Sequence, residues 1–594
     1  MLTYVADFET TVPKTREYAV NNEGDALIEA PDVSESTRVW AYGICEIGNV
    51  DNFIHGTDIA DFIAWCKTGQ NKLVYFHNLK FDGEFIFYWL LTNGYRYSDK
   101  KESKTFSCLV SDTGYFYAIE IIFEKKNRKY KKVTFHDSLK KLPFSVDKIG
   151  KDFKLPVKKL DVPDGFYEWE RPIGHVLTEF EIQYLKQDVQ VIAMALSIQF
   201  EQELTRMTIG SDALHNFKSM VGKKQFERLF PILPTQIDRQ IRYSYKGGYT
   251  YVAERFAGKD IGEGIVYDVN SLYPSVMYYD RLPYGMPLPF IGEYEYDDFY
   301  PLYIQKLTCE FELKEGYIPT VQIKNGGRFK ETEYLKSSRD ALGNTEVTLV
   351  LTNVDLELMF EHYDVNVISY EGGWKFKECQ GVFNDYIDHW TEIKVANSVE
   401  KNALYSLAKL MLNNLYGKFA TNPEVAGKYP YLNDKGHVSY LETALEMRDP
   451  VYTAMGSFIT AYARLKTIST AQAVYNRFIY ADTDSIHLLG SSEPEIETHD
   501  SELGKWAWEG TFKRARFLRA KTYAEDMYTK DGKPCSPDEA NGTYFDVKCA
   551  GMPDKVKEGV TWENFQVGLS LGGKLMPKHV AGGIILRDTY FTII

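Results

Sequence analysis

The sequence has no long hydrophobic run and few cysteines. No segment of the 594 residues approaches the ~18 uninterrupted apolar residues of a membrane-spanning helix. The N-terminal segment lacks the basic and apolar regions of a secretory signal peptide. The seven scattered cysteines form no CxxC pair and no zinc-ligand spacing, and a sparse, odd set is typical of a reducing cytoplasm. We therefore expect a cytoplasmic protein without a membrane anchor.

The chain also lacks an excess of positive charge. Its 69 basic and 83 acidic side chains give a net charge of −14, which disfavours a protein coated all over in nucleic acid but allows a basic channel in an acidic shell. Two local runs oppose this average. Residues 124–132 (EKKNRKYKK) hold six basic side chains, and residues 512–523 (FKRARFLRAKTY) hold five with three aromatics. Either run could be a solvated face, but the interleaved aromatics of the second favour a phosphate-tracking groove.

Strand-like and helical patterns alternate along the chain, which predicts a mixed α/β multidomain fold. The apolar residues of 2–11 predict a first strand that ends in acids. A helix should begin after Thr178, because Glu181 completes a capping box with it. The first domain is expected to end just beyond that helix, near residue 190. Residues 421–442 predict a β-hairpin with Asn-Asp-Lys-Gly at its turn.

Acidic residues form a first constellation in the N-terminal part. Asp7 and Glu9 stand two apart on the expected strand and share one face. Asp82 follows in HNLKFDG, and Tyr184 and Asp188 share a face of the capped helix. Each acid alone could be a surface residue, but four carboxylates in this order could hold two Mg²⁺ or Mn²⁺ ions for phosphodiester cleavage. Tyr184 could then orient the attacking water.

A second acidic group is split along the chain. Asp268 ends the apolar stretch GIVYDV, and Asp482 and Asp484 lie in FIYADTDSIHLLG between two strand-like runs. The two aspartates should lie close together at a hairpin tip. A structural Asp turn would also explain DTDS, so the motif alone leaves its role open.

The segment 402–419 favours a catalytic role for these aspartates. On a helical wheel its polar and aromatic side chains lie on one face: Tyr405, Lys409, Asn413 and Tyr416. Its aliphatic side chains lie opposite and predict core packing: Leu404, Leu407, Met411 and Leu415. A lysine for triphosphate oxygens and an aromatic wall beside two metals describe nucleotidyl transfer.

These motifs resemble the protein-primed family B DNA polymerases of small bacteriophages with terminal-protein-capped linear genomes. DVNSLYP, KLMLNNLYGKFA, YADTDSIHL and KTY occur in the family's order, and the resemblance covers nearly the whole chain. It implies a DNA-directed DNA polymerase, a nucleotidyltransferase with 3′–5′ exonuclease activity. The enzyme would be processive and strand-displacing, would start from a protein primer, and would use two Mg²⁺ or Mn²⁺ ions per site.

The resemblance also implies partners and a location. The chain would act as a monomer on primer-template DNA and dNTPs in the cytoplasm of an infected bacterium, with no membrane. A terminal protein would serve as primer, and a single-stranded DNA-binding protein is a further candidate partner.

Domains are implied as well. An RNase H-like exonuclease domain would span 1–190, followed by a right-hand polymerase domain at 191–594. The polymerase parts would be a palm at about 191–277 and 451–530, a first insertion at about 278–373, fingers at about 385–420, a second insertion at about 421–450 and a thumb at about 531–594.

The resemblance assigns roles in the exonuclease domain. The metal-binding residues would be Asp7, Glu9, Asp82 and Asp188. Tyr184 and Lys159 would assist catalysis. The single-stranded 3′ end would lie against Thr10, Asn78, Phe81, Ser138 and Leu139.

In the polymerase domain Asp268 and Asp484 would bind the metals, with the Val269 backbone beside them and Asp482 in support. The incoming dNTP would contact Val269, Tyr273, Lys394, Lys409, Asn413 and Tyr416. Template and primer would contact Tyr245, Gly247, Gly248, Lys521 and Tyr523. Tyr273 would exclude a 2′-hydroxyl. The family often has a second lysine one turn before Lys409, where this chain has Tyr405, so the resemblance does not assign that triphosphate contact to this chain.

Three alternatives stay open. One is a nucleic-acid-primed family B polymerase without protein priming. Another is a nuclease whose C-terminal half merely grips DNA, which Asp268, Asp484 and Lys409 disfavour. The third is a non-catalytic replication scaffold, which the full set of carboxylates disfavours.

Overall fold

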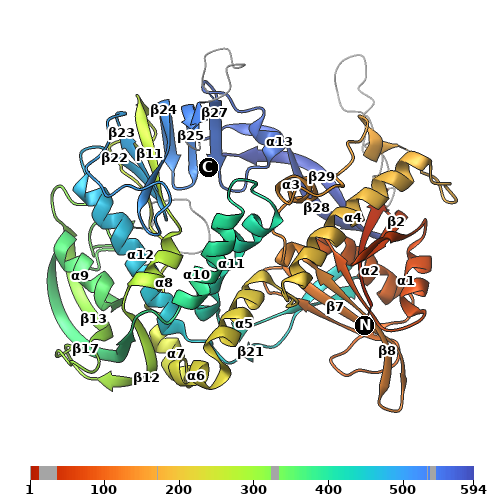
Figure 1. Cartoon of the computed structure of the whole chain (residues 1–594), viewed down its shortest axis with the longest axis horizontal. Helices are drawn as coiled ribbons and strands as arrows, with labels where there is room; N and C mark the ends of the chain where they lie inside the picture. The colour runs from red at the N-terminus through yellow and green to blue at the C-terminus, as the bar shows by residue number, and fades with distance from the viewer. Residues whose placement is uncertain are drawn as a thin grey trace.

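The computed structural model describes residues 2–11, 36–169, 171–322, 334–340, 342–530, 533–534 and 544–594. The chain forms an N-terminal half and a larger C-terminal half, each combining sheets and helices (Figure 1). The expected mixed α/β fold is confirmed. Parts of the expected first insertion and thumb lie outside the described residues. No helix among the described residues is long and apolar enough to cross a membrane.

The N-terminal half is built on an eight-stranded sheet. In order across the sheet its strands are β3 (Asn49–Gly56), β2 (Val39–Glu46), β1 (Leu2–Thr10), β4 (Lys72–Phe76), β8 (Lys129–Asp137), β7 (Phe116–Lys126), β6 (Thr105–Val110) and β5 (Arg96–Tyr97). The accompanying helices are α1 (Ile59–Lys67), α2 (Leu79–Thr92), η1 (Ser138–Lys140), α3 (Val146–Asp152), η2 (Phe166–Glu168) and α4 (Glu179–Glu201). The expected first strand is β1, which lies inside the sheet between β2 and β4.

Helix α4 begins as the capping box predicts. The Thr178 side chain accepts from the Glu181 N–H, and the Glu181 carboxylate accepts from the Thr178 N–H. The helix then continues to Glu201, so a domain boundary at residue 190 would fall inside it. α5 (Ile209–Val221) follows and leads into the C-terminal half.

The C-terminal half contains a nine-stranded sheet. Its order is β26 (Lys533–Pro534), β25 (Thr522–Lys530), β24 (Trp506–Arg519), β11 (Gly264–Val269), β23 (Ser485–Leu489), β22 (Phe478–Asp482) and β9 (Thr250–Val252), with β10 (Asp260–Ile261) on β24 and β27 (Tyr544–Cys549) on β25. β27 belongs to this sheet although residues 531–594 were expected to form a separate thumb.

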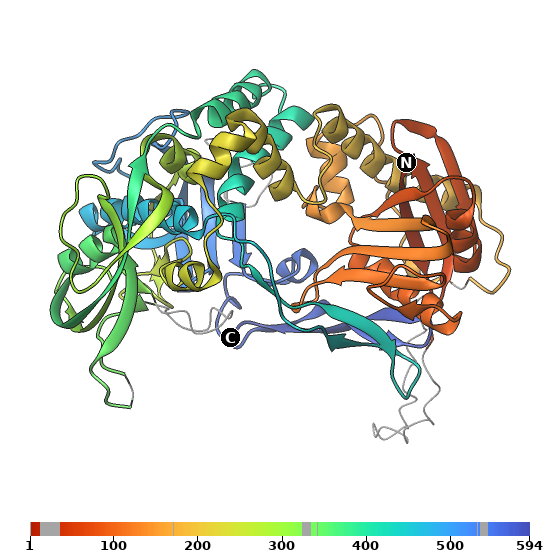
Figure 2. The same ribbon diagram turned by 90° about the horizontal axis from the view of Figure 1, so that it is seen from below.

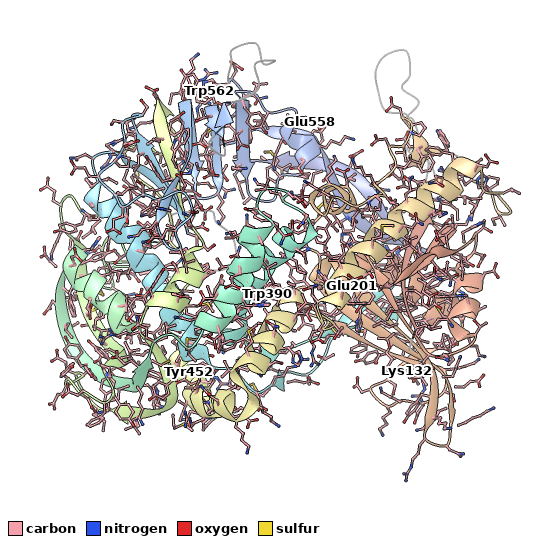
Figure 3. The ribbon with its side chains drawn as sticks, viewed as in Figure 1. Lys132, Glu201, Trp390, Tyr452, Glu558 and Trp562 are labelled. Carbon is pink, nitrogen blue, oxygen red and sulfur yellow. The ribbon has the colours of Figure 1, made fainter. Side chains whose placement is uncertain are left out.

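The same half contains the helices α6 (Lys223–Leu229), α7 (Thr235–Arg242), α8 (Leu272–Tyr279), α10 (Asn384–Ala396), α11 (Ala403–Phe419) and α12 (Thr453–Ala473), and α12 contacts β22 and β23 of the sheet. Their shared core contains Trp390 of α10 and Tyr452 (Figure 3). Trp390 donates its ring N–H to Asn216 of α5, and Tyr452 donates its hydroxyl to the Gly285 carbonyl. These two buried polar tips are therefore paired.

A further four-stranded sheet occupies the expected first insertion. Its order is β12 (Leu282–Phe290), β17 (Tyr363–Cys379), β13 (Leu302–Leu313) and β16 (Val347–Thr352), with α9 (Asn353–His362) packed on it and β14 (Val321–Gln322) paired with β15 (Tyr334–Leu335) nearby.

Two long hairpins leave the C-terminal half and reach the N-terminal half side by side (Figure 2). The insertion arm, 424–447, comprises β18 (Glu424–Val425), β19 (Lys428–Leu432), β20 (Val438–Glu442) and β21 (Glu446–Met447). The thumb arm, 570–592, comprises β28 (Ser570–Val580) and β29 (Gly583–Thr592), preceded by α13 (Asp554–Lys557). The hairpin expected within 421–442 is confirmed, with its turn between Asn433 and His437.

Candidate functional site

Four carboxylates converge in the N-terminal half, and we call them the N-terminal carboxylate site. β1 carries Asp7 and Glu9, α2 carries Asp82, and α4 carries Asp188. The Phe8 N–H donates to Asp82 Oδ1 at 3.2 Å, which ties α2 to β1. Glu9, Asp82 and Asp188 are all less than 9% exposed.

The carboxylates of this site disfavour one another's ionisation. Burial, and then the charge of Asp188, raise the pKa of Asp7 to about 7. Burial and Asp7 also raise the pKa values of Glu9 and Asp82 well above the ordinary range. Ionised carboxylates this close together need positive charge nearby. The four residues lie near one another, as the sequence predicts.

Lys159, which the resemblance implies would assist catalysis, supplies one such charge. Its Nζ lies 2.9 Å from Asp188 Oδ2 and 5.5 Å from the ring centroid of Tyr184. The Tyr184 hydroxyl lies 3.1 Å from that of Tyr167, a residue that the sequence motifs did not single out. Asp188 Oδ1 is buried and has no hydrogen-bond partner among the described residues. Lys159, together with Arg171 at Glu9, therefore opposes the mutual repulsion of the carboxylates only in part.

The residues expected to hold a single-stranded end lie around this site in different environments. Asn78 is exposed at the start of α2 with φ of 72°, and Phe81 is half-buried one turn later. Thr10 ends β1, and Leu139 is half-buried in η1. Ser138 is fully buried and its hydroxyl donates to a main-chain carbonyl, so its part in binding would be indirect.

A second group of acids lines a pocket of about 490 Å³ in the C-terminal half. We call it the C-terminal carboxylate site. Asp268 lies near the end of β11, and Asp484 lies at the tip joining β22 to β23. The Val269 N–H donates to the Asp484 carbonyl at 2.7 Å, which fixes this tip against β11. The hairpin tip expected for DTDS is confirmed.

The C-terminal carboxylate site also contains more acidic than basic side chains. Burial, followed by the carboxylates of Asp484 and Glu509, raises the pKa of Asp268 to about 8, and Lys409 opposes the shift. Burial likewise raises the pKa of Asp484. Glu509 was missed by sequence reasoning because it is the extra residue of a β-bulge in β24, and no motif marks it.

Asp482 has a different environment from Asp484. Its Oδ1 lies 2.5 Å from Lys521 Nζ and accepts from Thr250 at 3.1 Å, while its Oδ2 accepts from the Tyr480 hydroxyl at 3.2 Å. Asp482 is therefore already paired and is suited to position the tip rather than to bind a cation directly.

Aromatic and basic side chains border the same site. The pocket lining includes Tyr273 of α8, Tyr416 of α11, and Lys521 and Tyr523 near the β24–β25 turn. Lys409, Asn413 and Lys394 do not line this pocket. Lys409 and Asn413 are exposed on α11, while Lys394 Nζ of α10 lies 3.4 Å from the Ser271 hydroxyl.

The two faces expected for α11 are observed with one difference. Leu407, Met411 and Leu415 are buried, as the helical wheel predicts. Leu404 is only half-buried, because it lies in the first turn of the helix where neighbouring elements cover it incompletely.

The YKGG segment, Tyr245 to Gly248, lies against the tip between β22 and β23 that carries Asp484. A Cβ added to Gly248 would lie 2.6 Å from Thr483 Oγ1, so this close approach requires glycine. Arg464 donates to the Gly247 carbonyl at 2.8 Å, and Tyr245 is half-buried, with its pKa raised by burial and then by Tyr416.

The basic run 512–523 has mostly structural partners. Arg514 pairs with Asp526 and Arg516 with Asp260, and both guanidinium groups lie over the Trp562 ring (Trp562 in Figure 3). Phe512 and Phe517 are fully buried core residues, and Lys521 is the basic residue of this run that lines the pocket.

The other basic run, 124–132, forms the protruding hairpin of β7 and β8 (Lys132 in Figure 3). Lys132 pairs with Glu120 of β7, and most of the run is exposed. This placement is that of a solvated face.

Mg²⁺ or Mn²⁺ fits the chemistry of both carboxylate sites. Within the described part of the chain, no group of three or more His, Cys, Asp or Glu side chains is arranged to hold a metal ion as it stands. Mg²⁺ is usually bound by one or two carboxylates together with water and substrate phosphates. The uncompensated carboxylates of each site match that mode.

Comparison with known proteins places these sites in context. Residues 66–168 and 164–503 match the family described as DNA polymerase type B, organellar and viral. The chain is 52% identical to the DNA polymerase of Bacillus phage M2 over 566 residues, which cover 94% of this chain and 97% of that one. A crystal form of Phi29 DNA polymerase is similar at 48% identity and a TM-score of 0.91, with all of both chains covered. Phi29 DNA polymerase complexed with primer-template DNA and incoming nucleotide substrates is similar at 48% identity and a TM-score of 0.89, again over all of both chains.

Proposed function

The chain belongs to the organellar and viral family of type B DNA polymerases, in its protein-primed phage branch, and on that premise we propose how its residues divide the work. It is a DNA-directed DNA polymerase. We propose that the C-terminal carboxylate site adds nucleotides to a primer and that the N-terminal carboxylate site removes mispaired ones from its 3′ end.

The observation that carries the polymerase assignment is the pocket that unites Asp268 and Asp484 with Tyr273 and Lys521. Two divalent cations held by the aspartates would neutralise the triphosphate and the attacking oxygen. Lys409 and Lys394 lie near enough for Lys409 to lower the Lys394 pKa in addition to burial, and both would face phosphate oxygens. Asp482 and Lys521 hold the tip in place.

For the exonuclease we propose that Asp7, Glu9, Asp82 and Asp188 bind two divalent cations. Tyr184 and Lys159 would position the attacking water and the Asp188 carboxylate. Asn78, Phe81, Thr10, Leu139 and Ser138 surround the path of a frayed 3′ end. The support for this is the excess of carboxylate over ammonium at the site.

Primer-template DNA and dNTPs are the substrates that follow from the family. We propose that Gly247, Gly248 and Tyr245 face the template, that Tyr523 and Lys521 face the primer, and that Asn413 and the Val269 backbone lie beside the dNTP. We further propose a terminal protein as primer, a single-stranded DNA-binding protein as partner, and action as a monomer in the cytoplasm of an infected bacterium.

We propose the domain division set out above with two adjustments. The exonuclease domain passes into the polymerase through the continuous helix α4, and β27 joins the palm sheet rather than the thumb. The insertion arm and the thumb arm would lie around the DNA, which would favour processive synthesis and strand displacement together.

The insertion arm rests on the N-terminal half through matched contacts. The rings of Tyr429 and Tyr97 stack with 4.7 Å between centroids, and the Asp112 N–H donates to the Ala426 carbonyl at 3.2 Å. A hairpin that made no contact with the N-terminal half would be a tolerated surface loop. These contacts therefore favour a functional role for the insertion arm.

Labelled dNTP incorporation on a primed template with Mg²⁺ tests the assignment. Asp268→Asn and Asp484→Asn should each reduce incorporation by several orders of magnitude while degradation of a single-stranded oligonucleotide persists. Retained incorporation in either variant would overturn the polymerase site. A wild-type protein that degrades DNA but incorporates nothing would support the nuclease alternative.

Strand displacement has a separate test. Replacing residues 424–448 with a short Gly-Ser turn should leave gap filling on an open template largely intact. The variant should stall at a downstream duplex and make shorter products when a trap limits the enzyme to one DNA encounter. Long products through duplex under the trap would show that the insertion arm is only a loop.

A further inference from the structure

Both arms of the polymerase half end at one side chain of the exonuclease half. Glu84 lies on α2 and is 2% exposed, between the apolar residues of that helix. The Tyr440 hydroxyl of the insertion arm donates to Glu84 Oε1 at 2.8 Å. His579 Nε2 of the thumb arm lies 3.2 Å from the same carboxylate oxygen, at ion-pair distance. A single carboxylate thus contacts two arms that are far apart in sequence.

A carboxylate at this position is costly without these partners. Glu84 Oε2 is buried and has no hydrogen-bond partner among the described residues. Burying a charge in an apolar setting is unfavourable unless it is paired. Among the described residues, Tyr440 and His579 are the partners of Glu84, and both belong to the arms, so a favourable environment for its carboxylate depends on both arms being in contact with α2.

At the tip of the thumb arm, two glycines allow the backbone to approach the exonuclease half closely. The Thr37 N–H donates to the Ala581 carbonyl at 2.9 Å. A Cβ on Gly582 would lie 1.7 Å from the Thr37 carbonyl oxygen, and one on Gly583 would lie 2.7 Å from the Phe85 side chain. The arm tip therefore lies directly against the segment that precedes β2 and against helix α2 of the exonuclease half.

The insertion arm is seated beside it. The Tyr440 ring makes edge contacts with Phe87 of α2 and Phe116 of β7, with centroid separations of 6.3 and 6.2 Å. The rings of Tyr440 and His579 are 6.2 Å apart. The two arm tips and α2 thus form one junction with a polar centre and an aromatic rim.

The junction closes a circuit of elements. The chain joins the two halves covalently through α4 and α5, whereas the two arms return to the exonuclease half through non-covalent contacts alone. Figure 2 shows both arms spanning from one half to the other. Such a circuit can open at the junction without unfolding either half.

We propose that Glu84 is the clasp that closes this circuit around DNA, a positioning residue for processive synthesis with no part in the chemistry. This inference rests on the proposed function, since a clasp matters only for an enzyme that keeps hold of DNA between additions. Glu84 raises the pKa of His579, while burial and then Lys80 of α2 oppose the shift. The clasp therefore combines an ion pair with the Tyr440 hydrogen bond.

The test compares clasp variants with a matched surface control. Glu84→Leu, His579→Gln and Tyr440→Phe remove the carboxylate or one of its two partners. Glu102→Gln removes a carboxylate of the same half that pairs with Arg96 at the surface. Product length under a single-encounter trap should fall several-fold in the clasp variants and stay at the wild-type value in the control. Addition of one nucleotide without a trap should stay within twofold of wild type.

Glu84→Gln tests for partial rescue, because its amide oxygen still accepts the hydrogen bond from the Tyr440 hydroxyl while the ion pair with His579 is lost. We expect product lengths between those of wild type and Glu84→Leu. Degradation of a single-stranded oligonucleotide monitors folding of the exonuclease half, and His579→Gln decides the matter if Glu84→Leu fails to fold. Wild-type product length in both Glu84→Leu and His579→Gln would overturn the clasp. If the wild-type protein adds no single nucleotide, the proposed function itself is overturned instead.

Discussion

The ring of Tyr273 stacks on the ring of Tyr416 with 3.9 Å between centroids and 20° between planes. Tyr273 lies in α8, five residues after Asp268, and Tyr416 lies in α11, so the stack joins two helices that flank the C-terminal carboxylate site. Burial and then Tyr416 raise the pKa of Tyr273. Two neutral rings in contact form a rigid apolar wall beside the C-terminal carboxylate site.

The wall predicts sugar selectivity. Tyr273→Val should increase ribonucleotide incorporation relative to dNTP incorporation by at least tenfold, because the ring that would meet a 2′-hydroxyl is removed and no binding group is lost. Competing dNTP and rNTP incorporation on one template measures the ratio. Tyr279→Val, an exposed tyrosine at the end of the same helix, is the matched control. An unchanged ratio in Tyr273→Val would show that another group excludes ribose.

The N-terminal carboxylate site predicts the reverse separation of activities. Asp188→Asn should abolish 3′ trimming, because it removes a proposed metal ligand and the partner of Lys159 together. Synthesis should remain within a fewfold of wild type, since Asp188 lies in the other half. Trimming of a 3′-labelled oligonucleotide measures the effect, with Asp152→Asn in the same half as the control. Wild-type trimming in Asp188→Asn would exclude it from the site.

Local chemistry determines which parts of this structure could be predicted. The capping box at Thr178 and the turn at Asn433 depend on neighbouring residues, so their elements were predicted correctly. Asp268 and Asp484 are far apart in sequence, and only their motifs indicated a shared site. Glu509 depends on a β-bulge that no local pattern specifies. Glu84 depends on tertiary contacts across 356 residues to Tyr440, which no local pattern encodes.

Gly248 offers a test of how tightly the YKGG segment fits. Gly248→Ala should reduce incorporation by tenfold or more, because the new Cβ would lie 2.6 Å from Thr483 Oγ1 and displace the aspartate tip. Gly262→Ala is the control, since its Cβ would meet nothing within 4 Å. Adding Thr483→Ala to Gly248→Ala removes the clashing hydroxyl and should restore part of the activity. No recovery in the double variant would mean that template contact, rather than this clash, requires glycine.

A buried ion pair joins the two halves and predicts a large stability effect. Lys141, after η1, pairs with Asp212 of α5, and both side chains are at most 1% exposed. The Lys141 ammonium also donates to the carbonyls of Leu204 at 3.0 Å and Arg206 at 2.9 Å. Burial lowers the pKa of Lys141, and Asp212 opposes the shift. The pair therefore persists because three oxygens satisfy one buried cation.

Lys141→Met should destabilise the protein by about 3–5 kcal/mol, because it leaves the Asp212 carboxylate buried without its cation. Lys148→Met breaks an exposed pair with Asp152 at 2.8 Å and should cost less than about 1 kcal/mol. Thermal unfolding of the full chain measures both. The double variant Lys141→Met with Asp212→Leu replaces the whole pair by apolar groups and should recover part of the lost stability. If the double variant is less stable than Lys141→Met, the group whose loss of a partner dominates is the Arg206 N–H, which donates to Asp212 Oδ1 at 2.7 Å.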